Sequence, residues 1–383
     1  MTFEAPRDVT AALQDPLRLA GLTPGNWDLV VRQARAAGIL ARLDDVIARE
    51  GVPVSVPAGP ALHLESFRLV ADAQRKEVLR EVRQVHAALQ PIGTNIVLLK
   101  GAAYVVAELP AARGRLFADL DIMVPKEQLP DVEAQLRLHG WIGSHYDAYD
   151  QRYYREWMHE IPPLEHIRRG TVLDVHHNIL PPTSCLKPDP AKLFAAAVPA
   201  ASAPGLKILA PADMVLHSMS HLFHNDDLSH ALRDLSDLDL LLRHFGKQVA
   251  FWPELVERAR ELDLARPLHY GLRYSKRVLA TPVPEDALHA ASRAAPVPGL
   301  AGFMDAMWLR ALRPPHPTTA DWLTPFAMFF LYVRAHWLRM PPHLLLPHLI
   351  RKSWKRRTES WFERGKEGKK GAYDGAPIMR PDR

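Results

Sequence analysis

The sequence predicts an α/β (α+β) protein in which helices precede and follow a small central sheet. Long stretches on both sides of the centre have apolar residues at helical spacing. Between them, short apolar runs bounded by Gly and Pro are typical of buried strands. The expected parts are an N-terminal helical layer over 1–90, a core over 91–185, a helical domain over 186–320, amphipathic basic helices over 321–363 and a disordered tail over 364–383.

Length and composition indicate an ordinary globular protein. A chain of 383 residues that is 48% hydrophobic can build a sizeable core. The single cysteine, Cys185, excludes an internal disulfide and suits a reducing compartment. The first residues lack the basic start and apolar run of a secretory signal. The most apolar stretch, 328–338, contains Arg334 and His336 and is short for a membrane span. We therefore predict a cytoplasmic protein.

The formal net charge of +5 is unevenly distributed. From Arg351 to the end the chain has eleven Lys/Arg and five Asp/Glu, so the remainder is close to neutral. A protein that binds nucleic acid over its whole surface would spread its basic residues more widely. The high isoelectric point is thus a property of the C-terminal stretch.

The N-terminal half predicts helices first and then a strand. Residues 24–50 have apolar residues at helical spacing and end before Gly51 and Pro53, which are helix breakers. A longer amphipathic helix is expected over 58–90. A buried strand over 95–99 then leads through Gly101 into a helix over 102–108.

The stretch 118–125 predicts a strand that carries two carboxylates on one face. Side chains alternate along a strand, so Asp119 and Asp121 share a face while Leu120 and Ile122 point into a core. Two adjacent carboxylates repel each other and are costly to bury unless a cation lies between them. Mg²⁺ prefers carboxylate oxygens. The pattern therefore predicts a metal site that also holds phosphates.

A third carboxylate is expected beside this pair. After a helix over 127–139, a strand beginning at Gly140 and an aromatic segment over 146–158, residues 164–168 and 171–177 predict a hairpin. On its second strand Asp174 and His176 share one face. The remaining chain predicts helices over 211–224, 228–245, 251–279, 284–293, 298–312 and 321–358.

The ordered set of these motifs resembles a known enzyme family. The motifs are Lys100-Gly101, Arg115, Asp119-Leu120-Asp121 and the strand 173–177. Together they resemble the bacterial family of uncharacterised nucleotidyltransferases in the DNA polymerase β-type superfamily. The resemblance implies a polymerase β-like core sheet, Mg²⁺ or Mn²⁺ as cofactor and an NTP as substrate.

The resemblance also implies roles for single residues. Asp119, Asp121 and Asp174 would be the catalytic metal ligands, and Lys100, Gly101, Ala102 and Arg115 would bind the nucleotide. The superfamily usually has Gly-Ser or Gly-Gly where this chain has Gly101-Ala102, so one hydroxyl contact is missing.

The expected function is transfer of a nucleoside monophosphate from an NTP to a hydroxyl or phosphate of an acceptor, with release of pyrophosphate. A small-molecule or peptide acceptor is favoured over RNA. The alternatives are a toxin-like enzyme that modifies tRNA and a non-catalytic, nucleotide-binding scaffold protein. The acceptor, the preferred NTP and the oligomeric state are left open by the sequence.

Histidines and the basic C-terminal stretch add further candidates. His176 and His221 are candidates for an acceptor pocket. His217, His221 and His224 share one face of a predicted helix, which leaves open a zinc face, a pocket lining or a structural role. The basic and apolar residues of 334–361 leave open contact with an anionic membrane surface, binding of RNA or packing on the protein body.

Overall fold

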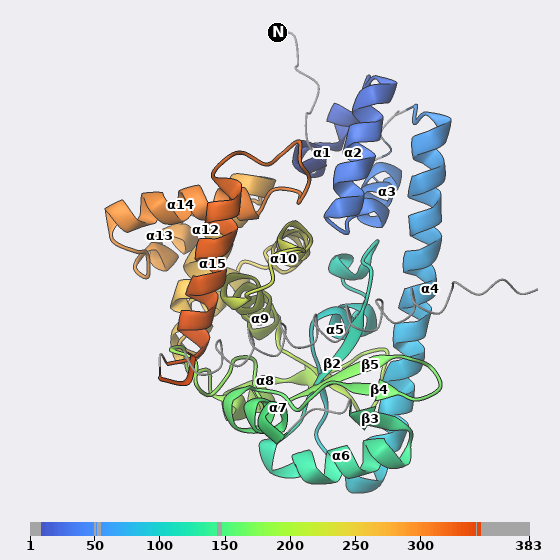
Figure 1. The fold of residues 1–383 in the computed structure, drawn as a ribbon, viewed down its shortest axis with the longest axis vertical. Helices are drawn as coiled ribbons and strands as arrows, with labels where there is room; N and C mark the ends of the chain where they lie inside the picture. The colour runs from blue at the N-terminus through green and yellow to red at the C-terminus, as the bar shows by residue number, and fades with distance from the viewer. Residues whose placement is uncertain (1–8, 50, 52–54, 144–147, 342, 346–383) are drawn as a thin grey trace, which may run out of the picture. The chain divides into compact units, whose positions relative to one another are not determined.

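The computed structural model describes residues 9–49, 51, 55–143, 148–341 and 343–345 (Figure 1). Residues up to Arg339 form one compact unit, and a second unit begins at Met340. The strands and helices given below all belong to the first unit. The tail predicted over 364–383 and the end of the helix predicted over 321–358 lie outside the described residues.

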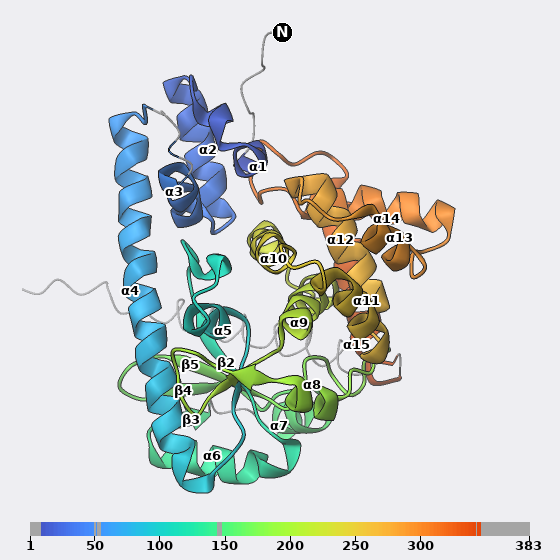
Figure 2. The same cartoon turned by 180° about the vertical axis from the view of Figure 1, so that it is seen from behind.

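The N-terminal part is helical, as the sequence predicts. Its elements are α1 (Val9–Gln14), η1 (Pro16–Leu19), α2 (Pro24–Ala36), α3 (Leu40–Arg49) and the long α4 (Ala58–Leu89). The periodic stretch 24–50 forms two helices, because the chain reverses at Gly38, whose φ of 70° favours glycine. Figures 1 and 2 show α4 running from α2 and α3 to the sheet, and it packs against all three.

The sheet has seven strands in the order β3-β4-β5-β2-β1-β7-β6. Their bounds are β1 (Val97–Leu98), β2 (Asp119–Met123), β3 (Trp141–Gly143), β4 (Leu164–His166), β5 (Val172–His176), β6 (Val198–Pro199) and β7 (Lys207–Ile208). The predicted hairpin is present as the antiparallel pair β4–β5. The sequence did not indicate β6 and β7, because two-residue strands show no alternation.

Strand β2 lies in the middle of this sheet and is buried on both faces. It pairs in parallel with β5 and antiparallel with β1. Leu120 and Ile122 are buried as expected, and Asp121 and Met123 on the opposite face are buried as well. Both α4 and α5 (Lys100–Val106) pack against this strand. The carboxylate of Asp121 therefore lies in the protein interior.

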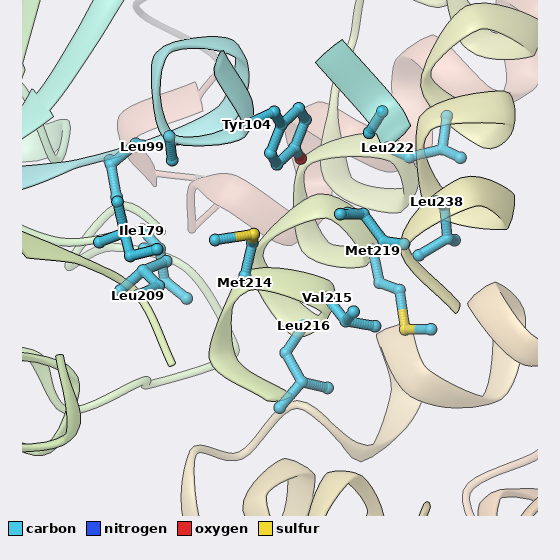
Figure 3. Packing of buried hydrophobic residues seen from close by; sticks show 14 of the residues in the cluster. Leu99, Tyr104, Ile179, Leu209, Met214, Val215, Leu216, Met219, Leu222 and Leu238 are labelled. Carbon is cyan, nitrogen blue, oxygen red and sulfur yellow. The ribbon is translucent and has the colours of Figure 1, made fainter. Parts of the chain in front are cut away.

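The other helices complete the core. They are η2 (Gln90–Ile92), η3 (Pro110–Ala112), η4 (Lys126–Gln128), α6 (Leu129–Leu138), α7 (Ala148–Arg152), the π-helical η5 (Tyr153–Trp157), α8 (Pro190–Ala196), α9 (Pro211–His224), α10 (Ala231–Phe245), α11 (Phe251–Glu261), α12 (Ala265–Leu279), α13 (Glu285–Ser292), α14 (Pro298–Ala311) and α15 (Thr324–Arg339). Figure 3 shows part of the hydrophobic cluster that joins the sheet to the helices, including Leu99, Tyr104, Met219 and Leu238.

Two further observations bear on the predictions for this part. The stretch 251–279 is divided into α11 and α12, and Asp263 between them has a φ of 58°. Within the described ranges, none of the helices combines the length and the apolar character needed to cross a membrane.

Candidate active site

The register of β2 against β5 brings two predicted carboxylates side by side. Asp121 is the direct partner of Asp174 in the parallel ladder, and Met123 is the partner of His176. Asp119 begins β2 and is exposed, whereas Asp121 is only 3% exposed. Residues two apart on a strand share a face, so Asp119 and Asp121 point to the same side.

Asp121 is held as a carboxylate by two nitrogen donors. Its Oδ1 accepts hydrogen bonds from Nζ of Lys100 and from Nε2 of His176, both at 2.9 Å. Burial alone would raise the pKa of Asp121, but Lys100 and His176 outweigh it and hold that pKa well below its ordinary value. The pKa of Lys100 is raised in turn, because Asp121 outweighs the effect of burial.

Asp174 lacks such compensation. It is half-buried, and its Oδ1 is buried without a hydrogen-bond partner. Burial, together with the negative charges of Asp121 and Glu160, raises the pKa of Asp174 to about 7. Desolvation and then Asp121 also raise the pKa of Asp119. An unpartnered oxygen among like charges is a natural place for a cation.

Lys100 and Gly101 form a strained and tightly packed start of α5. Lys100 has a φ of 42°, a left-handed conformation that costs free energy for any residue except glycine. A Cβ on Gly101 would lie 2.8 Å from the ring of Phe117 and 3.0 Å from Nη1 of Arg115. Ala102 is buried as well. The strained backbone directs the ammonium of Lys100 to Asp121.

Arg115 is not an open phosphate ligand in this structure. Its Nε donates to Oδ2 of Asp237 on α10 at 2.8 Å, and Oδ1 of Asp237 lies 2.6 Å from Nη1 of Arg42 on α3. All three side chains are largely buried. We call the trio Arg42, Asp237 and Arg115 the clamp. Gly114 packs so closely on α3 that a Cβ would lie 2.5 Å from backbone atoms of Ala41 and Arg42.

The predicted histidines divide into two groups. His176 lies in the site, between Asp121 and Glu160. His217 on α9 interacts electrostatically with the site: burial and then the charges of Lys100 and His176 lower its pKa to about 3. His221 behaves similarly, with a pKa well below its ordinary value. His224 is buried elsewhere, and burial, followed by the charges of Arg334 and Arg339, lowers its pKa to about 3.

Sequence reasoning missed two residues of this neighbourhood, His159 and Glu160. The segment that contains them forms an antiparallel bridge between Glu160 and His176. His159 lies with its ring centroid 5.1 Å from that of His176. The adjacent His-Glu pair was the only local signal, and its partner on β5 is a long-range contact that no sequence pattern indicates.

A pocket of about 200 Å³ lies next to Asp119. Apolar side chains from α4, β2, β5 and the segment before β2 line it, namely Val78, Leu120, Val172 and Phe117. Gln74 and Glu77 of α4 add polar groups. The pocket is small and mostly apolar, which suits part of a small molecule rather than a folded macromolecule.

Comparison with known proteins supports one assignment. The model of a family described as "Uncharacterised nucleotidyltransferase" matches residues 23–280, which include β1, β2, β5 and the clamp. No curated protein matches the chain. The matched region is about two thirds of the chain and contains every residue of the site described above. The chain therefore belongs to this family of nucleotidyltransferases.

Proposed function

We propose that this protein transfers a nucleoside monophosphate from an NTP to a hydroxyl or phosphate group of a small molecule or peptide, with Mg²⁺ or Mn²⁺ as cofactor and pyrophosphate as the second product. The family assignment supports nucleotidyl transfer in general. The cofactor, the acceptor class and a cytoplasmic location, where NTPs are available, are part of the proposal.

The observation that carries the cofactor proposal is the state of Asp174. Its Oδ1 is buried and unpartnered next to Asp121, and its pKa is raised to about 7. Oxygen donors of this kind fit Mg²⁺ or Mn²⁺ better than softer metals. Asp119, exposed at the start of β2, would supply a further oxygen ligand. The residues present therefore fit a hard divalent cation.

When bound, such a cation would neutralise charge on the phosphates and on the attacking oxygen. The chain's own residues would do the rest. Lys100 and His176 fix the orientation of Asp121 through hydrogen bonds to one oxygen. Asp174, the partner of Asp121 in the ladder between β2 and β5, would position the acceptor hydroxyl or accept its proton, as a carboxylate can in general base catalysis. Lys100 directly precedes Gly101 and Ala102 at the start of α5, and its ammonium would contact phosphate.

For Arg115 we propose a positioning role in place of direct phosphate binding. Its guanidinium is held by Asp237, so it fixes the loop between α5 and β2 that leads to Asp119. The pocket beside Asp119 is our candidate for the place where a small acceptor or the base binds. His176 and His221 would then limit the opposite side of the site.

The test uses purified protein, Mg²⁺ or Mn²⁺, each α-labelled NTP and a small-molecule fraction of cell extract. We expect label to move to a small molecule or peptide and pyrophosphate to be released. Asp121→Asn and Asp174→Asn should each reduce transfer by about 100-fold or more, because metal ligands act only together. Asp131→Asn, an exposed aspartate on α6, is the matched control and should keep full activity.

The outcomes separate the alternatives. Label on RNA that depends on the site aspartates would favour the tRNA-modifying enzyme. NTP binding without transfer to any fraction, unchanged by Asp174→Asn, would favour the scaffold protein. Lack of NTP binding under all conditions would contradict the proposed function.

A further inference from the structure

Three side chains beside the carboxylates converge as metal donors. His159, Glu160 and His176 each offer a ligand atom, and these atoms lie within 4.8 Å of one another. Among the described residues, no other group of three His, Cys, Asp or Glu side chains has ligand atoms this close together. The three aspartates of the proposed magnesium site are farther apart by this measure. The two sets therefore differ in donor type as well as in position.

The backbone holds these three residues in register. Glu160 bridges antiparallel to His176 at the end of β5. Hydrogen bonds on either side fix the bridge: the N–H of Ile161 donates to the carbonyl of Val175 at 3.0 Å, and the N–H of His177 donates to that of His159 at 2.8 Å. The segment that contains His159 and Glu160 is thus held to β5 by backbone hydrogen bonds.

The ring of His176 is oriented as in a metal-bound histidine. Its Nε2 contacts Oδ1 of Asp121 at 2.9 Å, and because that oxygen belongs to an ionised carboxylate, Nε2 carries the hydrogen. In the neutral ring, Nδ1 would then present a lone pair toward Oε2 of Glu160, 3.3 Å away. Nδ1 of His176 and Oε2 of Glu160 would then be two hydrogen-bond acceptors facing each other, unless a proton or a metal ion lies between them. Metal-ligating histidines commonly donate their second nitrogen to a carboxylate in this way.

The unpartnered atoms support the same interpretation. Nδ1 of His176, a residue only 2% exposed, is buried without a hydrogen-bond partner, and so is Nδ1 of His159. Buried polar atoms are normally satisfied, so buried imidazole nitrogens without hydrogen-bond partners, on two residues of one donor group, call for a ligand. An anion is excluded by the adjacent carboxylates of Glu160 and Asp121.

We propose that His159, Glu160 and His176 form a binding site for a borderline-soft divalent transition metal of the Zn²⁺ class. Two imidazoles and one carboxylate match Zn²⁺, whereas Mg²⁺ requires oxygen donors. Three protein ligands leave a coordination position open, as in catalytic zinc sites. Asp121 then links the two metal sites, because it fixes the ring of His176 on one side and faces Asp174 on the other. The proposal does not depend on nucleotidyl transfer.

The test is titration of the metal-stripped, full-length protein with two metal ions. Calorimetry measures the binding of Zn²⁺, and visible absorption measures the binding of Co²⁺. Every sample carries Cys185→Ser, because the exposed thiol is itself a zinc ligand. We expect one Zn²⁺ per chain, bound equally well in millimolar Mg²⁺, and a Co²⁺ spectrum of low-coordinate nitrogen and oxygen ligation.

Variants assign the ligands. His159→Gln and Glu160→Gln should each weaken Zn²⁺ binding by more than about 100-fold, since loss of an outer-shell partner alone costs about 10- to 100-fold. Asp121→Asn should fall within that outer-shell range. His139→Gln, an exposed histidine after α6, is the matched control and should bind as the parent does. Far-UV circular dichroism checks that each variant is folded.

Several results would overturn the proposal. One is Zn²⁺ binding that survives both His159→Gln and Glu160→Gln. Another is binding that is lost in His217→Gln but kept in Glu160→Gln, which would place the ion on α9. Displacement of Zn²⁺ by Mg²⁺ would indicate an oxygen-only site. Absence of stoichiometric binding to the parent protein would mean that a proton alone bridges His176 and Glu160.

Discussion

At the scale of single residues, the carboxyl of Asp174 makes the stability of the folded protein depend on pH. Its carboxyl has a pKa of about 7 in the folded protein, against about 3.9 in an unfolded chain. The folded state therefore binds more protons between these values, and the free energy of unfolding falls as pH rises through this window. Below about pH 4 the carboxyl is protonated in both states and has no such effect.

The direction of this pH dependence gives a prediction for Asp174→Asn. In EDTA at about pH 8 the variant should be more stable than the parent by about 1–3 kcal/mol, less than the ~4 kcal/mol of a full shift because the group is partly solvated. At about pH 4 the two proteins should be nearly equal. Urea unfolding at both pH values measures the difference. A gap that does not widen with pH would contradict the assigned pKa.

If Asp174 ligates a metal ion as proposed, its carboxyl should also control the pH dependence of metal binding. A protonated carboxyl cannot ligate Mn²⁺, so Mn²⁺ affinity should fall as pH is lowered through about 7 and level off above it. Calorimetric titrations between about pH 6 and 8 would show this, and Asp174→Asn should bind weakly at every pH. Equal affinity of the parent across that range would place the metal away from Asp174.

Lys100 permits a test that separates backbone strain from charge. Both Lys100→Gly and Lys100→Ala remove the ammonium that contacts Asp121, but only glycine relaxes the φ of 42°. We expect Lys100→Gly to be more stable than Lys100→Ala by about 0.5–1 kcal/mol in urea unfolding. Nucleotidyl transfer should be reduced equally in both. A difference in transfer between the two folded variants would show that the backbone conformation at residue 100 itself contributes to catalysis.

At the scale of elements, the clamp ties three segments that are distant in the sequence. Arg42 on α3 also donates to the carbonyls of Ala111 and Arg113, so α3, the loop before β2 and α10 share one buried carboxylate. Asp237→Asn would remove the carboxylate that pairs with two largely buried guanidinium groups. We expect a loss of about 3–5 kcal/mol in the free energy of unfolding.

The control for the clamp is an exposed ion pair. Asp28 lies 2.7 Å from Arg32 on α2, with both side chains more than half exposed. Asp28→Asn should change stability by less than about 0.5 kcal/mol. Comparable losses in the two variants would show that Asp237 has no special role, and the assignment of Arg115 to positioning would then be wrong.

Element by element, the sequence predicts what depends on local periodicity. The alternation over 118–125 and 171–177 was enough to place Asp121 and Asp174 on strands. In the structure these two strands are parallel, and their register makes the two aspartates direct neighbours. Long-range contacts were not predictable: the bridge of Glu160 to His176 joins segments that share no pattern. Nor was the pairing of Arg115 with Asp237, because a guanidinium suits a carboxylate as well as a phosphate.

At the scale of the whole molecule, the excess of basic charge and the candidate site lie in different parts of the chain. The site and the clamp lie between Arg42 and Asp237, within the region matched by the family model. The excess of Lys and Arg lies beyond Arg351, and the first compact unit ends at Arg339. If the acceptor is a small molecule or a peptide, the basic stretch should not be needed for transfer.

A truncation after Leu345 tests this separation. We expect the shortened protein to keep the parent's transfer rate to a small acceptor within about twofold, because no site residue is removed. Any binding of the full chain to RNA should be lost with the basic stretch, and in the full chain it should weaken steeply as salt is raised. If transfer instead requires the stretch and decreases with salt as RNA binding does, then RNA is the acceptor. The truncation thus decides between the two enzyme hypotheses, because only an RNA substrate links transfer to the basic residues beyond Arg351.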